Sequence, residues 1–291
     1  MSKPSQDFLP CLVGSMSVGA AGNPTVAMIE AAFAHHKLHY RYINMEVSPD
    51  DLESAVSGAA AMGFTGFNCS LPHKVKVIDY LDGLGESARI MGAVNCVVRR
   101  DAQWIGENTD GKGFLASLRE VIQPSGCSVT ILGAGGAARA IAVELALAGV
   151  AQITLVNRDR ERGQSLSTLL QQSLKVAAHF EPWQPEHPIS EESTILVNAT
   201  SVGLYDSQAK LDIDLKTLRS DLVVADVIFN PPQTQLLREA AKRGCRTIDG
   251  LGMIVQQGVT CIEYWTGCQA DPVIMRQAVE QALGLTPPHT S

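Results

Sequence analysis

Two short polar clusters in the first half of the chain contain residue types that can move a proton. Lys74 directly follows a strand-like run and comes shortly after Asn68 and Ser70, and Asp110 ends the cluster Asn108-Thr109-Asp110. A lysine near a carboxylate can pass a proton to or from a substrate oxygen and can donate a hydrogen bond to a carbonyl. Lys74 is therefore a candidate for proton transfer, although its position suits an exposed lysine in the first turn of a helix equally well.

A glycine-rich stretch near the middle of the chain predicts a phosphate-binding turn. The apolar run Val129–Leu132 is typical of a buried parallel strand, and the pattern after the turn predicts a helix over 138–149. The N–H groups of such a turn, with the positive end of the helix that follows, favour an anionic pyrophosphate. The residues that we expect to bind it are Gly133, Ala134, Gly135, Gly136 and Ala137.

The end of the next strand-like run indicates which dinucleotide binds. The run Ile153–Val156 ends in Asn157-Arg158-Asp159. An NAD-binding fold usually places a carboxylate at this tip, where it binds the ribose 2′-hydroxyl. Arg158 suits a 2′-phosphate instead, which favours NADP, and Asp159 leaves NAD possible. The alternative is that the glycine turn only packs a helix on the sheet and binds no phosphate. The arginine at the end of the second strand argues against this alternative.

Composition excludes several classes of protein. The 291 residues are 45% hydrophobic and 18% charged, which predicts a globular chain of about two domains. A net charge of -7 argues against nucleic acid as a partner. No run approaches the roughly 18 apolar residues of a membrane span, and Met1–Asp7 lack the apolar region of a signal peptide. Seven cysteines without paired spacing predict a reducing, cytoplasmic location and no metal site.

Helix and strand patterns alternate along the chain, which predicts an α/β fold with two domains. We expect residues 1–110 to form an α/β substrate-binding domain with a mixed or mostly parallel sheet. Residues 111–249 should form a Rossmann-type, doubly wound NADP-binding domain. Residues 250–291 should contain two helices that return to the first domain and a frayed tail. The strands expected in the Rossmann domain are 129–132, 153–157, 175–180, 194–199, 222–228 and 246–249.

The order and spacing of seven motifs resemble the shikimate dehydrogenase family. The motifs are Asn68-x-Ser70-x-Pro72-x-Lys74, Gly92–Asn95, Asn108–Gly111, Gly133–Ala137, Asn157-Arg158, Asn198–Gly203 and Asp249–Met253. They run in register from about residue 43 to the C-terminal helix. The resemblance implies an NADP-dependent shikimate dehydrogenase, which reversibly reduces 3-dehydroshikimate to shikimate in aromatic amino acid biosynthesis.

The resemblance also implies roles for single residues. It makes Lys74 and Asp110 the catalytic pair that handles the proton of the C3 oxygen while NADPH delivers hydride. The residues implied in substrate binding are Ser70, Asn95 and Gln257. The residues implied in cofactor binding are the glycine turn, then Asn157, Arg158 and Arg162 at the 2′-phosphate, and Thr200 and Gly250 close to the cofactor.

Two departures from the family pattern concern the carboxylate of the substrate. The family usually has Ser-x-Ser-Pro before its first helix, and both hydroxyls bind the carboxylate, but this chain has Ala21-Gly22-Asn23-Pro24. A tyrosine that the family has after the fifth strand is Phe229 here. The residues that could replace the two hydroxyls are Ser15 and Ser17, which we expect in a loop over 14–22, or Asn23 and Thr25.

These departures leave the substrate open among small cyclic hydroxy acids. Shikimate is the first candidate, and quinate, an aminoshikimate or another ring acid, with NAD or NADP, is the second. A non-catalytic nucleotide-binding regulatory protein is the alternative of another class, and the presence of both Lys74 and Asp110 argues against it. The two polar motifs argue against a dehydrogenase of unrelated substrate, such as a folate or amino acid. We expect a monomer or a homodimer.

Overall fold

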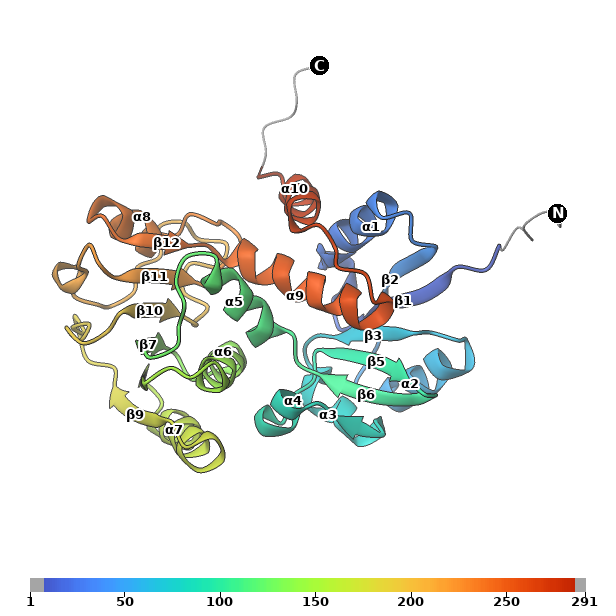
Figure 1. The fold of residues 1–291 in the computed structure, drawn as a ribbon, viewed down its shortest axis with the longest axis horizontal. Helices are drawn as coiled ribbons and strands as arrows, with labels where there is room; N and C mark the ends of the chain where they lie inside the picture. The colour runs from blue at the N-terminus through green and yellow to red at the C-terminus, as the bar shows by residue number, and fades with distance from the viewer. Residues whose placement is uncertain (1–7, 286–291) are drawn as a thin grey trace, which may run out of the picture. The chain divides into compact units, whose positions relative to one another are not determined.

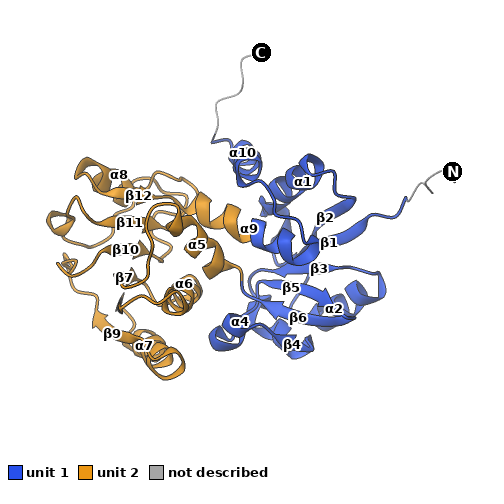
Figure 2. Ribbon diagram, viewed as in Figure 1, with its two compact units in different colours: residues 1–108, 258–291 blue, residues 109–257 orange. Residues whose placement is uncertain are grey.

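The computed structural model describes residues 8–285, which form two compact α/β units. One unit draws on residues 1–108 and 258–291, and the other is 109–257 (Figure 2). The sequence pattern placed these boundaries after residues 110 and 249. In the structure, the units divide between Gln257 and Gly258, inside helix α9 (Gly250–Thr266), so each unit contains part of this helix. The expectations for Met1–Asp7 and for the tail fall on residues 1–7 and 286–291, which lie outside the described residues.

The first unit contains a six-stranded mixed sheet with strand order β2-β1-β3-β5-β6-β4. Its strands are β1 (Cys11–Ser17), β2 (Tyr40–Glu46), β3 (Gly66–Cys69), β4 (Gly83–Leu84), β5 (Cys96–Arg100) and β6 (Gln103–Glu107). Strand β1 pairs in parallel with both β2 and β3, whereas β5 pairs antiparallel with β3 and β6. The parallel pairing brings the carboxyl ends of β1, β2 and β3 to one edge, which we call the first carboxyl edge.

Helices cover the sheet of the first unit. They are α1 (Thr25–His35), α2 (Leu52–Ala61), α3 (His73–Lys76), α4 (Glu86–Met91) and α10 (Pro272–Ala282), with the short 3-10 helices η1 (Ala20–Gly22) and η2 (Val77–Tyr80). Helix α1 packs against α10 (Figure 1), which confirms that C-terminal helices return to the first domain. Phe64, Phe67 and Trp104 belong to the core that includes α2.

The prediction of a loop at Ser15 and Ser17 was wrong. We expected a strand over 8–14 and a loop from residue 14, but β1 continues to Ser17. Ser15 pairs with Asn44 of β2 and with Asn68 of β3, and Ser17 pairs with Glu46. Serine and glycine have weak strand preference in isolation, and here hydrogen bonding to a neighbour on each side outweighs it.

The second unit contains six parallel strands in the order β12-β11-β10-β7-β8-β9. They are β7 (Ser128–Leu132), β8 (Gln152–Asn157), β9 (Ala177–Pro182), β10 (Ile195–Asn198), β11 (Val223–Asp226) and β12 (Arg246–Ile248). From β7 the sheet grows first to one side, through β8 and β9, and then to the other, through β10, β11 and β12, as in doubly wound nucleotide-binding sheets. The predicted Rossmann-type fold is therefore confirmed. Its carboxyl ends form the second carboxyl edge.

The helices of the second unit connect these strands. They are α5 (Asp110–Arg119), α6 (Gly136–Leu147), α7 (Arg160–Leu174) and α8 (Gln235–Lys242), with the 3-10 helix η3 (Leu215–Thr217). Helix α5 packs on α6 (Figure 1). Across the described part of the chain, no helix combines the length and the apolar character that a bilayer crossing requires.

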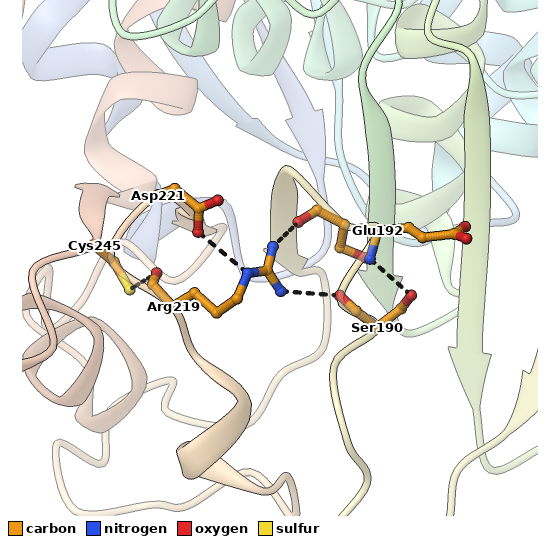
Figure 3. Close-up of polar contacts among 6 residues, drawn as sticks. Ser190, Glu192, Arg219, Asp221 and Cys245 are labelled. Carbon is orange, nitrogen blue, oxygen red and sulfur yellow. Dashed lines mark hydrogen bonds and ion pairs between the residues drawn. The ribbon is translucent and has the colours of Figure 1, made fainter.

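Arg219 holds the opposite, amino-terminal edge of the second sheet together (Figure 3). Its guanidinium donates to the carbonyl oxygens of Ser190 at 3.3 Å and Ser193 at 2.7 Å, and it pairs with Asp221 at 3.2 Å. The Cys245 thiol donates to the Arg219 carbonyl oxygen at 3.1 Å. These residues precede β10, β11 and β12, so the cluster fixes the ends of the strands that lie away from the second carboxyl edge.

Candidate active site

Backbone hydrogen bonds gather three predicted site residues, Ser70, Lys74 and Asn95, in the first unit. The Lys74 carbonyl oxygen accepts from the Val94 N–H at 2.8 Å. The Asn95 carbonyl oxygen accepts from the Cys69 N–H at 2.9 Å, and Ser70 follows directly. Because Cys69 ends β3, these bonds place all three side chains on segments at the first carboxyl edge.

The two nearby lysines lie in different surroundings. Lys74 is half-buried. Burial raises the pKa of the Cys69 thiol to about 12, and the Lys74 ammonium acts against that shift, so the two side chains are close. Lys76 is exposed and pairs with Asp79 at 2.8 Å. Lys74 therefore lies close to the end of β3, and Lys76 is a surface charge.

Ser15 belongs to a buried polar network beneath the first carboxyl edge. Ser15 is 1% exposed and Ser17 is 4% exposed. Burial raises the pKa of Tyr42 well above its usual range, and a hydrogen bond with Ser15 acts against that shift. The Tyr42 hydroxyl donates to Asn68 Oδ1 at 2.9 Å, and Asn68 Nδ2 donates to the Asn95 carbonyl oxygen at 3.0 Å. Ser15 thus supports the segments that carry the site.

Glu46 is a residue of this edge that our sequence reasoning missed. It ends β2 and pairs in register with Ser17. Its Oε1 accepts from the Gly19 N–H at 2.8 Å and its Oε2 from the Ala20 N–H at 2.7 Å, and these two bonds lower the pKa of Glu46. A carboxylate of the protein therefore occupies donors in the segment before α1. An acidic residue at the end of the predicted strand was the signal available.

Asn23, another candidate for binding the substrate carboxylate, makes bonds within the protein. Its Oδ1 accepts from the Thr25 N–H at 3.0 Å, and its carbonyl oxygen accepts from Asn44 Nδ2 at 3.1 Å. These bonds fix the start of α1 against β2. A role for Asn23 or Thr25 in binding the substrate carboxylate stays a prediction.

Asp110 is the first residue of α5, in the second unit, so the predicted catalytic pair takes one residue from each unit. Two glycines allow α5 to approach its neighbours. A side chain at Gly111 would lie 2.2 Å from the backbone of α6, and one at Gly113 would lie 2.5 Å from the Gln257 nitrogen. Thr109 Oγ1 donates to Gln257 Oε1 at 3.2 Å. Asp110 and Gln257 thus lie on packed segments of the second unit.

The glycine turn lies between β7 and α6 and has the form that the sequence predicts. Gly133 has φ +111°, and a Cβ there would lie 3.0 Å from the Ala199 carbonyl oxygen. Helix α6 begins at Gly136, and no described side chain caps it at Gly135. N–H groups of the first turn of a helix have no partner within the helix. The residues Gly133–Ala137 therefore fit a pyrophosphate.

A pocket of about 270 Å³ lies at the end of β8. Its walls include three predicted cofactor residues, Asn157, Arg158 and Thr200. Arg162, which the resemblance also assigns to the 2′-phosphate, is not among the residues that line it. Its Nε instead lies 3.4 Å from the carboxylate of Asp159. The structure thus brings the first three together and leaves Arg162 aside.

A buried network of hydrogen bonds that our sequence reasoning missed holds Thr200 in place. Asn198 Oδ1 accepts from both the N–H and the hydroxyl of Thr200, at 3.1 and 2.7 Å. Asn198 Nδ2 donates to Asp226 Oδ1 at 2.9 Å, and Thr234 Oγ1 donates to Asp226 Oδ2 at 2.7 Å. Burial raises the pKa of Asp226. The motif Asn198–Gly203 and an aspartate at the end of an apolar strand were the signals available for this role.

The remaining predicted positions concern the start of α9. A side chain at Gly250 would lie 2.5 Å from the backbone of Ile228, so close packing accounts for this glycine. Its N–H donates to the Ile228 carbonyl oxygen at 3.2 Å. Phe229, where the family has a tyrosine, is half-buried.

The parallel sheet with its glycine turn, together with a second unit that carries a half-buried lysine, is typical of two-domain nucleotide-dependent dehydrogenases. Sequence comparison agrees along the chain. Residues 23–97 match the shikimate dehydrogenase substrate binding domain, 117–227 match shikimate / quinate 5-dehydrogenase, and 250–280 match the shikimate 5'-dehydrogenase C-terminal domain. The NADP(+) shikimate dehydrogenase of Alkaliphilus oremlandii is 42% identical over 241 residues, covering 81% of this chain and 84% of that protein. This chain belongs to the shikimate/quinate dehydrogenase family of NAD(P)-dependent oxidoreductases, which confirms the predicted family.

Solved structures add a relative with a different substrate. The 5-ketofructose reductase of Gluconobacter sp. strain CHM43 is 51% identical, with a TM-score of 0.94, covering 95% of this chain and 100% of that chain. A shikimate dehydrogenase in complex with NADP+ is 33% identical, with a TM-score of 0.87, covering 94% and 96%. Solved relatives in the family carry NADP+ or NAD.

Proposed function

We propose that this protein uses NADPH to reduce a small polyhydroxylated ketone that has no carboxylate, with 5-ketofructose as the first candidate. Identity to the 5-ketofructose reductase is 51%, against 42% to the A. oremlandii shikimate dehydrogenase. Both proteins belong to one fold family, and substrate choice depends on the site more than on the fold. The residues at the first carboxyl edge therefore have to support the choice.

The bonding of Glu46 is the observation that carries this proposal. The family resemblance assigns the segment before the first helix to the substrate carboxylate. Here Ala21 and Asn23 replace the two serines, and the Gly19 and Ala20 N–H groups already bind Glu46. A second carboxylate in this segment would meet a like charge, and the two serine hydroxyls of the family pattern are missing from it. A neutral ligand meets neither obstacle.

The residues for the reaction itself are those of the family. In the proposed reduction, Lys74 donates a proton to the oxygen of the ketone, and Asp110 is its partner in handling that proton. Ser70, Asn95 and Gln257 bind the hydroxyl groups and orient the carbonyl. A bound NADPH supplies the hydride. These residues suit any ketone flanked by hydroxyls, so they do not by themselves select a ring acid.

The second candidate is reversible reduction of 3-dehydroshikimate. The motif Asn68-x-Ser70-x-Pro72-x-Lys74 and the many relatives named as shikimate dehydrogenases favour it. A place in aromatic amino acid biosynthesis belongs to this candidate and stays a prediction, as do activity on quinate and a cytoplasmic location.

Steady-state turnover separates the two candidates. NADPH oxidation is followed by absorbance with 5-ketofructose and with 3-dehydroshikimate, and NADP+ or NAD reduction with shikimate and quinate. We expect the largest kcat/KM with 5-ketofructose. A larger kcat/KM with 3-dehydroshikimate or quinate would assign the protein to the ring acids, and turnover of none of them would refute both candidates.

A further inference from the structure

A lysine distant in sequence from the glycine turn reaches the pocket at the end of β8. Lys210 lies in the connection between β10 and η3 and lines the pocket together with Asn157 and Arg158. Lys210 is exposed, and within residues 8–285 its ammonium makes no hydrogen bond or ion pair. The pocket therefore has a second cationic side chain beside Arg158.

Trp183 fixes the segment that carries Lys210. Its backbone N–H donates to the Asn157 carbonyl oxygen at 3.1 Å, and its indole Nε1 donates to the Asp212 carbonyl oxygen at 2.8 Å. One residue, through its backbone and its side chain, thus connects the end of β8 to the segment two residues after Lys210. The backbone that carries the lysine is held against the strand end before any ligand binds.

The carboxylates near this pocket have other partners. Asp159 Oδ1 accepts from the Arg162 N–H at 3.0 Å, which caps α7, and Asp159 does not line the pocket. Asp212 does line it, and its Oδ1 accepts from the Glu186 N–H at 2.8 Å. Two cations and one engaged carboxylate leave the pocket with a net positive charge.

We infer that Lys210 and Arg158 together bind the 2′-phosphate of NADP(H), so that Lys210 selects NADP over NAD. Arg158 offers a planar set of donors and Lys210 a point charge, and a phosphate monoester accepts from both. This role replaces the one that the sequence assigned to Arg162. The inference rests on the proposed function only in that the cofactor is a dinucleotide.

Binding of two adenosine nucleotides tests this role without any ketone substrate. Adenosine 2′,5′-bisphosphate and adenosine 5′-monophosphate are titrated calorimetrically into the full-length protein, into Lys210→Met and into Lys216→Met. Lys216 is exposed in η3 and does not line the pocket, so it is the matched control. We expect Lys210→Met to weaken the bisphosphate about tenfold and the monophosphate less than twofold. Lys216→Met should change neither.

Three results would overturn the inference. They are equal binding of the two nucleotides by the unaltered protein, equal weakening of both by Lys210→Met, and an unchanged bisphosphate affinity in Lys210→Met. Because these titrations contain no ketone, they are independent of the substrate. Selective loss of the bisphosphate in a protein that reduces no ketone would support the role of Lys210 while refuting the proposed function.

Discussion

The two carboxyl edges offer ligands different kinds of atoms. The second edge offers backbone N–H groups at Gly133–Ala137, where the path of the chain creates the site. The first edge offers side chains, among them Ser70, Lys74 and Asn95, with Glu46 occupying two backbone donors. Many sequences can provide one backbone path, but a single substitution changes a side-chain site. We therefore expect dinucleotide binding to follow from the fold, and the choice of substrate to depend on individual residues of the first edge.

The largest effect should come from the first edge. Lys74→Ala should lower kcat by about 10²–10⁴-fold, because a general acid contributes this much, while the affinity for NADPH changes little. Steady-state kinetics and a fluorescence titration with NADPH measure the two quantities. Lys76→Ala is the control, since Lys76 is an exposed lysine of the same helix. A near-normal kcat in Lys74→Ala would remove the lysine from the reaction.

The hydrogen bonds of Asp226 at the second carboxyl edge should contribute to the stability of the folded protein. Asp226→Ala should lower the free energy of unfolding by about 1–3 kcal/mol, because Asn198 and Thr234 lose a buried acceptor. Denaturant unfolding measures it, with Glu191→Ala at an exposed position of the same unit as control. Weaker NADPH binding in Asp226→Ala would show that the second carboxyl edge also depends on this side chain. Equal stability of the two variants would contradict the stabilising role of the Asp226 hydrogen bonds.

The same aspartate predicts a dependence on pH. Burial raises the pKa of folded Asp226 above its ordinary value of 3.8. Folding therefore favours the protonated carboxyl. The stability that this proton contributes is fully present below pH 3.8 and is lost as the pH rises through the raised pKa. The stability advantage of the unaltered protein over Asp226→Asn should fall across that window. A constant advantage across the window would show that Asp226 does not titrate as inferred.

Substitution of two arginines tests which side chains bind the 2′-phosphate beside the glycine turn. Arg158→Met should weaken NADPH about tenfold and NADH much less, because Arg158 lines the pocket at the end of β8. Arg162→Met should weaken NADPH less than twofold, since Arg162 is engaged with Asp159. Fluorescence titrations with both dinucleotides measure this. The reverse order of the two effects would restore Arg162 to the 2′-phosphate.

The smallest effect should be a shift in substrate preference. Glu46→Gln should raise kcat/KM for 3-dehydroshikimate relative to 5-ketofructose by roughly three- to tenfold, because one like charge is removed. Glu53→Gln, an exposed change on α2, is the control. Since two N–H groups lower the pKa of Glu46, the discrimination should persist at neutral pH and weaken only below the ordinary value of 4.5. An unchanged ratio would separate Glu46 from substrate selection.

Local patterns in the sequence determined much of this protein. Continuous apolar runs and alternating helices predicted the parallel sheet, and the strand, glycine turn and helix expected over 129–149 predicted the phosphate site. These features depend on residues within one or two turns of each other. Motif spacing also indicated the family, and the roles it assigns to Lys74 and Asp110 stay predictions.

Only the tertiary structure decided which distant residues meet. Strand β1 extends to Ser17 because β2 and β3 pair with it, although serine alone favours a loop. Glu46 reaches Gly19 through the register of β1 with β2, and the path of a long connection brings Lys210 to the pocket that Arg158 also lines. Such contacts depend on strand order and loop path, which come from packing of the whole unit and leave no short-range pattern in the sequence.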